Sequence, residues 1–316
     1  MSKIRNDYCR FNSIEKLKSL KMLLKTLKTM LVIFVSYLLL ISCSDQSDEV
    51  VIDNTTQTPN LLFRSGFEED VYIDETVYED SEDYRFIKGV DVQTAYSWPI
   101  TILGATESAL HYIQDDNHTA VFAEIQTVQG HNGNFTKALY QEENYEYGDA
   151  TQCPYEILNI TDGRKDLYIR YWIKLDSSSL TLVDKWRTFF EWKTKDYGVG
   201  TGFRLISFIY TDENGNPYWH WQGDKNSETP LWEIDNFEIP VPSNEWFLTE
   251  FYWHWSEGEE GRALWKINGQ VVGDHYGPST VNSKPIDFIL LSQIYGDANP
   301  KHQWVDDIEI WDGLPE

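Results

Sequence analysis

Hydrophobic and polar residues alternate with a period of two along most of the chain after residue 60. The alternation is clearest in residues 187–222, which predict three consecutive strands. On one face the first two strands are expected to place Arg187, Phe189, Glu191 and Lys193, followed by Arg204, Ile206, Phe208 and Tyr210. The third is expected to separate Tyr218, His220 and Gln222 from Trp219 and Trp221. One face of this region therefore combines charges, an imidazole and aromatic rings, which suits a sugar-polymer groove, although a solvated outer face would show the same pattern.

Further runs rich in aromatic and β-branched residues predict strands at 61–70, 109–114, 119–126, 135–142, 168–176, 247–255, 262–267, 270–276, 286–296 and 302–313. Asn268-Gly269 is typical of a two-residue hairpin turn. Residues 71–100 and 143–166 are expected to be irregular, and no long segment has a helical period. The pattern predicts an all-β sandwich of about 12 to 14 short strands in two packed sheets.

The N-terminal segment has the pattern of a lipoprotein signal peptide over residues 1–42. A Lys-rich stretch precedes an apolar run at 31–41, which is shorter than the about 20 residues that a membrane span needs. Residues 40–43 resemble a bacterial lipobox, which implies lipidation of Cys43. A signal peptide without lipidation and an uncleaved anchor remain alternatives. Residues 43–60 are expected to form a flexible acidic tether, and residues 61–316 the folded domain. We therefore expect an outer-membrane lipoprotein of the cell envelope, surface-exposed or secreted, which is anchored to the membrane through its lipid.

The charge and the cysteines exclude several classes of function. Removal of residues 1–42, which hold 8 Lys/Arg and 2 Asp/Glu, changes the formal charge from −25 to −31. Such a chain repels nucleic acid, and at long range it also repels anionic polymers. Cys153 is the only cysteine after Cys43, so neither an intrachain disulfide nor a zinc site is expected. We expect a monomer without an organic cofactor.

Segments at the two ends of the predicted domain resemble strands of a known fold family. The segment SGFE at 65–68 and the segment VDDIEIW at 305–311 are similar to the first and last strands of the concanavalin A-like jelly rolls of bacterial polysaccharide lyases and glucanases. The resemblance implies that these strands pair and that Ca²⁺ binds to their carboxylates, here Glu68 and Asp307, with Asp306 as a weaker candidate. A turn of solvated acids is the alternative.

The central strands extend the resemblance. The segments FFEW, GFRLISFIY, WHW and PVPSNEWFLTEFYW look like those of jelly-roll polysaccharide lyases from marine and gut Bacteroidetes. Those enzymes act by β-elimination on uronic-acid polymers such as ulvan, glucuronan or alginate. The resemblance implies a concanavalin A-like β-jelly roll that acts as a lyase on an anionic polysaccharide.

Elimination needs cations that neutralise the uronate carboxylate, and a base and an acid beside it. For proton transfer we expect Tyr295 and His220, and for neutralisation Arg204 and Lys193. The expected substrate-binding residues are Lys137, Glu191, Gln293, Trp192 and Trp219. Each of these residues also has an ordinary structural explanation, as a surface cation, a hydrogen-bonded histidine or a strand-end ring.

Two other functions remain open. Glu233, Asp235 and Glu238 fit E-x-D-x-x-E, which resembles the catalytic strand of laminarinase-type retaining endo-glucanases. Pro240 and Pro242 follow at once, which is typical of a strand end. A non-catalytic glycan-binding lipoprotein would use the tryptophans as stacking platforms.

Overall fold

The computed structural model describes residues 58–316 except 75–76, 80–81, 100–107, 112, 116–117, 144–155, 159–163, 181–182, 184–185, 195–196, 198–201, 226–228, 282–288 and 292–300. The described part is an antiparallel β-sandwich, as the alternation predicted, and it is of the jelly-roll type that the resemblance implied. One short 3₁₀ turn, Ser177–Leu180, interrupts the strands. No helix in this part is long and apolar enough to span a membrane. The predicted signal peptide, Cys43 and most of the tether lie outside the described residues.

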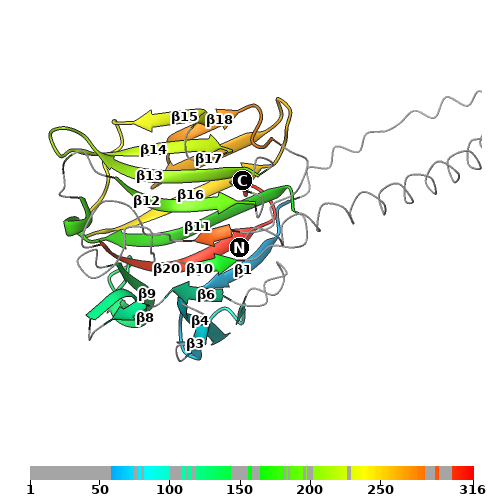
Figure 1. Cartoon of the computed structure of the whole chain (residues 1–316). Coiled ribbons are helices and arrows are strands. Elements are labelled where there is room, and N and C mark those ends of the chain that lie inside the picture. Colours follow the sequence, from blue (N-terminus) through cyan, green and yellow to red (C-terminus); the bar gives the residue numbers. More distant parts are fainter. Residues whose placement is uncertain are drawn as a thin grey trace, which may run out of the picture. The chain divides into compact units, whose positions relative to one another are not determined.

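Two sheets form the sandwich (Figure 1). The nine-stranded sheet has the order β18 (Gln270–Tyr276), β17 (Arg262–Ile267), β16 (Trp246–His254), β11 (Asp166–Leu175), β20 (Lys301–Trp311), β9 (Phe135–Glu143), β8 (His118–Gln129) and β7 (Ile113–Asp115), and β1 (Leu61–Ser65) also pairs with β20. The eleven-stranded sheet has the order β15 (Pro230–Asn236), β14 (Pro217–Asp224), β13 (Arg204–Thr211), β12 (Trp186–Lys193), β19 (Ile289–Leu291), β10 (Glu156–Leu158), β6 (Ser108–His111), β4 (Glu82–Val90) and β2 (Val71–Ile73). Strands β3 (Val77–Glu79) and β5 (Ser97–Trp98) pair with β4.

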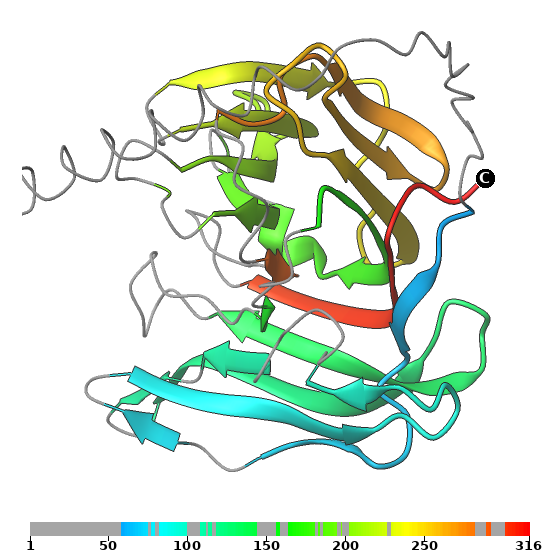
Figure 2. The ribbon, with the colours of Figure 1, turned by 90° about the vertical axis from the view of Figure 1, so that its right-hand side faces the viewer.

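Aromatic side chains fill the space between the two sheets. Figure 2 shows β12–β14 and β16–β18 as two facing layers. Phe251 of β16 lies at the centre, with its ring centroid 4.1 Å from that of Phe190 and 5.4 Å from that of Trp265. Trp192 stacks on Trp253 at 5.2 Å. Because these rings are fully buried, every second position of the central strands is committed to the core.

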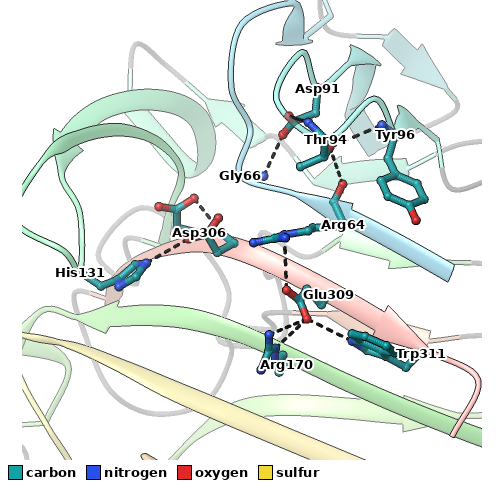
Figure 3. Close-up of polar contacts among 11 residues, drawn as sticks. Arg64, Gly66, Asp91, Thr94, Tyr96, His131, Arg170, Asp306, Glu309 and Trp311 are labelled. Atoms are coloured by element: carbon teal, nitrogen blue, oxygen red, sulfur yellow. Dashed lines mark hydrogen bonds and ion pairs between the residues drawn. The ribbon is translucent and has the colours of Figure 1, made fainter. Parts of the chain in front are cut away.

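The first and last strands pair, as the resemblance implied. Phe63 of β1 is opposite Ile310 of β20. On the outer face, Glu309 of β20 accepts hydrogen bonds from Arg170 of β11 at 2.7 Å and from Trp311 at 3.1 Å, and Arg64 lies 3.4 Å away (Figure 3). These contacts join three neighbouring strands through one carboxylate.

The buried carboxylate of Asp91 fixes the chain where β1 ends. It accepts hydrogen bonds from the Ser65 hydroxyl and from the backbone N–H groups of Gly66 and Thr94 (Figure 3). Burial by itself would raise the pKa of Asp91, but these hydrogen bonds hold it below its ordinary value. Asp91 is therefore an ionised anchor for the loop that follows β1.

The alternation expected for the first of the three strands predicted in residues 187–222 is wrong at one point. A bulge between Thr188 and Phe190 shifts the pattern by one residue. Arg187 consequently points into the sandwich, where its Nη2 donates to Gln303 Oε1 of the opposing sheet at 2.6 Å. Phe189 is also in the core, whereas Glu191 is on the opposite side of the strand.

Several strands were not predicted. Residues 71–100, expected to be irregular, contain β2, β3, β4 and β5, and β10 lies within the expected loop 143–166. The acidic segment 230–236 is edge strand β15. The hydrophobic alternation is weak in edge strands and in segments rich in carboxylates. Whether such segments form strands therefore depends on the strands with which they pair.

Replacing Phe251 by Ala is expected to lower the free energy of unfolding by about 3–5 kcal/mol, because it removes a fully buried ring from the centre of the core. Urea denaturation measures the change. Phe135→Ala is the matched control, since this ring is 81% exposed, and it should change stability by less than about 0.5 kcal/mol. Similar losses in both variants would contradict the assignment of the core.

Candidate functional site

The outer side of β12–β15 carries a connected set of polar side chains, which we call the polar face: Glu191, Arg204, His220, Gln222, Asp224 and Asp235. Strand pairing brings them together. His220 is opposite Asp235 across β14 and β15, and Arg204 is opposite Asp224 across β13 and β14. The predicted separation of His220 and Gln222 from Trp219 and Trp221 is confirmed, since both tryptophans are fully buried in the core.

His220 is held through both ring nitrogens. Nδ1 lies 2.6 Å from Asp235 Oδ1, and Nε2 lies 2.8 Å from Gln222 Oε1. The amide of Gln222 is oriented by its Nε2, which donates to Asp224 Oδ2 at 2.6 Å. Two acceptor oxygens therefore face the ring, and both ring nitrogens are already bonded within the protein. His220 can give its Nε2 proton to a substrate only where the substrate oxygen takes the place of Gln222 Oε1.

Arg204 is enclosed by acids. Its Nε donates to Asp224 Oδ2 at 3.0 Å, and its Nη1 donates to Glu191 Oε1 at 3.2 Å. The Tyr197 ring covers the guanidinium at 4.6 Å, and its hydroxyl donates to Asp224 at 2.7 Å. Burial, together with that hydrogen bond, raises the pKa of Tyr197, so the hydroxyl stays protonated.

The predicted role of Arg204 as the group that neutralises the substrate is therefore wrong: two carboxylates already compensate its single charge, and only 7% of the residue is exposed. The same geometry corrects the prediction that Glu191 binds substrate. Glu191 is 1% exposed and holds Arg204. Both residues organise the floor of the polar face.

An aromatic row leads from His220 to the sheet edge. The edge of the Tyr210 ring faces His220 at 5.0 Å, Tyr218 stacks on Tyr210 at 5.6 Å, and Phe237 stacks on Tyr218 at 4.4 Å. Phe237 is 67% exposed. Burial, with smaller effects from Tyr218 and Asp235, raises the pKa of Tyr210 to about 12. Tyr210 is thus a hydroxyl donor, and the row offers ring surfaces of the kind that contact sugars.

Three of the predicted substrate-binding residues lie outside the polar face. Trp192 and Trp219 are fully buried between the sheets, so they cannot contact a substrate, and these predictions are wrong. In a strand whose polar residues share one face, a tryptophan that alternates with them points to the opposite face, which here is the core. Lys137 is on β9 of the other sheet, where Nζ donates to the Thr127 hydroxyl at 2.8 Å, so it is not part of the polar face.

The structure does not describe the other predicted residues in full. Tyr295 and Gln293 lie outside the described residues. For Lys193 the backbone position alone is described: it pairs with Arg204 at the end of β12. The roles predicted for these three residues remain predictions.

The acidic motif of the glucanase alternative does not occupy one strand. Glu233 and Asp235 are exposed on β15, an edge strand, whereas Glu238 follows the end of that strand, where its N–H donates to Asn236 Oδ1. Asp235 is instead the partner of His220. The structure thus gives Asp235 a role that the motif did not suggest.

The predicted calcium ligands gather around Gly66. A Cβ atom added there would lie 3.1 Å from Asp307 Oδ1 and 3.5 Å from Asp306 Oδ1, and near Glu68. Burial chiefly, and then Asp307 and Glu68, raise the pKa of Asp306 to about 8. Other groups occupy the neighbouring oxygens. The Thr136 hydroxyl donates to Glu68 at 2.7 Å, and His131, labelled in Figure 3, lies 3.0 Å from Asp307.

These acids have the hard oxygens that Ca²⁺ prefers. However, within the described residues no group of three or more His, Cys, Asp or Glu side chains is arranged to hold a metal ion. The predicted ligands Glu68, Asp306 and Asp307, which we call the acid cluster, therefore lie close together. Their arrangement does not establish a bound ion.

Sequence reasoning missed the pairing that builds the polar face. Asp224 and Tyr197 were not singled out, and nothing in their local sequence marks them. The signal for Asp235 was available: if β14 and β15 form a hairpin, an acid in the next strand comes opposite His220. Assigning that register required recognising residues 230–236 as a strand.

Neither a protein-family model nor a curated protein sequence matches the chain. Similar solved structures include an endo-β-1,4-glucuronan lyase from the fungus Trichoderma reesei (TM-score 0.45, 12% identity, covering 63% of this chain and 89% of that chain). A marine alginate lyase from Aplysia kurodai gives a TM-score of 0.43 at 11% identity, covering 61% and 87%. The cellulose induced protein Cip1 gives 0.43 at 14%, covering 66% and 93%. At these scores the likeness assigns no function.

The buried carboxyl of Asp306 predicts a specific pH dependence. Because its folded pKa of about 8 is above the unfolded value of 3.8, its contribution to stability is complete below about pH 4 and is lost as the pH rises to about 8. In chelator-containing buffer, the urea midpoint should fall over this range, and Asp306→Asn should flatten the fall. Glu238→Gln, which removes an exposed acid, should leave the slope unchanged. An unchanged slope in Asp306→Asn would contradict the assignment.

Proposed function

We propose that the protein is a polysaccharide lyase that cleaves a uronic-acid polymer by β-elimination at the polar face. The observation that carries the proposal is His220, fixed between Asp235 and Gln222 beside the aromatic row. A positioned proton donor next to ring surfaces is what glycosidic-bond cleavage on a bound sugar chain requires. Glucuronan and alginate, the polymers named for two of the similar structures, belong to the proposed class of substrate.

In the proposed reaction a base removes the C5 proton of the uronate. The C4–O bond then breaks as the C4=C5 double bond forms, and the leaving oxygen takes a proton. His220 Nε2–H supplies that proton once the leaving oxygen takes the place of Gln222 Oε1, while Asp235 holds the ring through Nδ1. Asp235 acts here as a positioning residue, since it reaches the substrate only through His220. We propose Tyr295 as the base, because the alternation within the strand predicted at 286–296 places Tyr295 on the same face as Gln293 in an otherwise apolar segment.

Charge limits how the uronate carboxylate can be held. The described part of the face has more carboxylates than cations, and Arg204 is already paired. We therefore propose that the ammonium of Lys193 meets the substrate carboxylate. Short-range pairing of this kind is compatible with an acidic protein, because salt screens the long-range repulsion.

The finer assignments are also proposals. We propose ulvan as the polymer, from the resemblance of the central strands. A lipid anchor at Cys43 would hold the enzyme at the outer membrane, facing outward, where such polymers are met. We propose that it acts there as a monomer.

The proton-transfer role predicts that His220→Ala lowers kcat on a uronic-acid polymer by roughly 10²-fold or more. Ultraviolet absorbance of the unsaturated ends, which only elimination makes, measures turnover. The matched control is His254→Ala, because His254 also pairs with an aspartate, Asp166 at 2.8 Å, but on the other sheet. Its kcat should change by less than about twofold.

Wild-type turnover in His220→Ala would remove His220 from the mechanism. Tyr295→Phe tests the proposed base in the same assay. An absence of unsaturated ends on ulvan, glucuronan and alginate, with new reducing ends from a neutral β-glucan, would replace the lyase proposal with a hydrolase. Binding without either product would indicate a glycan-binding protein.

We propose further that the acid cluster binds Ca²⁺ through Glu68, Asp306 and Asp307, with loss of the Asp306 proton. Millimolar CaCl₂ should then raise the melting temperature at pH 8 relative to a chelator, because an ion that binds only the folded state stabilises it. In Asp306→Asn the difference should disappear. An equal shift in both proteins would place the ion elsewhere.

A further inference from the structure

A cavity of about 450 Å³ lies on the nine-stranded sheet, on the other layer of the sandwich from the polar face. Its lining comes from β8, β11, β16 and β20 and from the segment around residue 130. The lining residue Trp304 stands between Gln303 and Val305, which are fully buried, and Lys174 stands between the buried Ile173 and Leu175. Their side chains therefore point away from the core, and the cavity is on the outer face.

Two tryptophans in the lining are held rigidly. The indole N–H of Trp246 donates to the carbonyl of Gln129 at 2.8 Å, and that of Trp304 donates to Gln126 Oε1 at 2.9 Å. Both polar edges are thus satisfied within the protein, so a ligand need not supply partners for them. The rings are ordered in advance, which lowers the entropic cost of stacking a ligand against them.

The polar lining is mostly neutral. Gln126, Gln129 and Asn244 contribute amides. Gln126 is bonded at both ends, to Trp304 and Glu124, whereas Gln129 Nε2 donates to the Gly133 carbonyl and Asn244 Oδ1 accepts from the Ser177 N–H. Gln129 Oε1 and Asn244 Nδ2 are therefore the amide atoms that can contact sugar hydroxyls.

The titratable lining residues are Lys174, His131 and Glu245. His131 is committed to Asp307 at 3.0 Å and stacks on Trp172 at 4.0 Å, whereas Lys174 Nζ lies over the Trp304 ring at 5.3 Å.

We propose that this cavity is a second sugar-binding site, which takes a pyranose residue of an acidic polysaccharide. Trp246 contributes the ring surface, the amides of Gln129 and Asn244 contact hydroxyls, and Lys174, which lies over the Trp304 ring, contacts the carboxylate. The cavity volume is within the range of small-ligand sites, about 300–1,000 Å³. The sugar site rests on the cavity, and only the choice of an acidic polymer rests on the proposed function.

A second site on the opposite layer changes how a long polymer is held. A chain bound there remains near the protein when it leaves the polar face, so rebinding is effectively intramolecular. Short oligosaccharides cannot occupy both sites at once. The site should therefore lower KM for the polymer and leave kcat, and KM for short fragments, unchanged.

The experiment is calorimetric titration of the full chain carrying His220→Ala with glucuronan and alginate oligosaccharides. Adding Trp246→Ala should weaken binding roughly tenfold or more at one site, since truncating an aromatic anchor removes most of its contact. Trp311→Ala is the matched control: it is a half-buried tryptophan on the same outer face, its indole N–H bonds to Glu309, and it is not in the lining. Lys174→Gln is a milder second variant and should weaken binding severalfold.

Equal affinities in the three variants would overturn the site, as would an absence of binding to either oligosaccharide. Melting temperatures confirm that each variant is folded. Binding that depends on Trp246 in a protein without turnover on any uronic polymer would support the site and remove only the lyase proposal. Turnover on a uronic polymer, together with binding that Trp246→Ala and Lys174→Gln leave unchanged, would support the lyase proposal and overturn the second site.

Discussion

The packing of aromatic rings between the two sheets is the constraint on which the rest of the structure depends. Phe251, Phe190, Trp192, Trp253 and Trp265 are fully buried and contact one another across the layers. Because successive side chains of a strand point to opposite faces, committing these rings inward sends their neighbours outward. The polar face and the cavity lining are both consequences of that commitment.

The polar face is stable because its buried charges are hydrogen-bonded as a set. Burying Arg204 with Glu191 and Asp224 costs solvation free energy, and the triad carries one excess negative charge. Donors from Tyr197 and Gln222 meet Asp224 and spread that charge. Gln222 in turn presents its oxygen to His220. The proposed proton donor is thus oriented by groups that also hold the floor of the site.

The two outer faces of the sandwich have different characters. The polar face places a histidine and an aromatic row on one layer, whereas the other layer carries the acid cluster and the cavity. His131 links the last two, since it lines the cavity and contacts Asp307. A substitution on one outer face can therefore change the function proposed for that face without changing the contacts of the other face.

The sequence by itself determined the all-β class, most strands and the outward orientation of His220 and Gln222, because these follow from local alternation. The pairing of the end strands was expected from a family resemblance and not from alternation. Only the tertiary structure decided the rest. The bulge at Thr188 reversed Arg187 and Phe189, and the opposing layer enclosed Trp192 and Trp219. The register of β13, β14 and β15 paired His220 with Asp235 and enclosed Arg204 between acids. Such contacts join residues distant in the chain, so no local pattern encodes them.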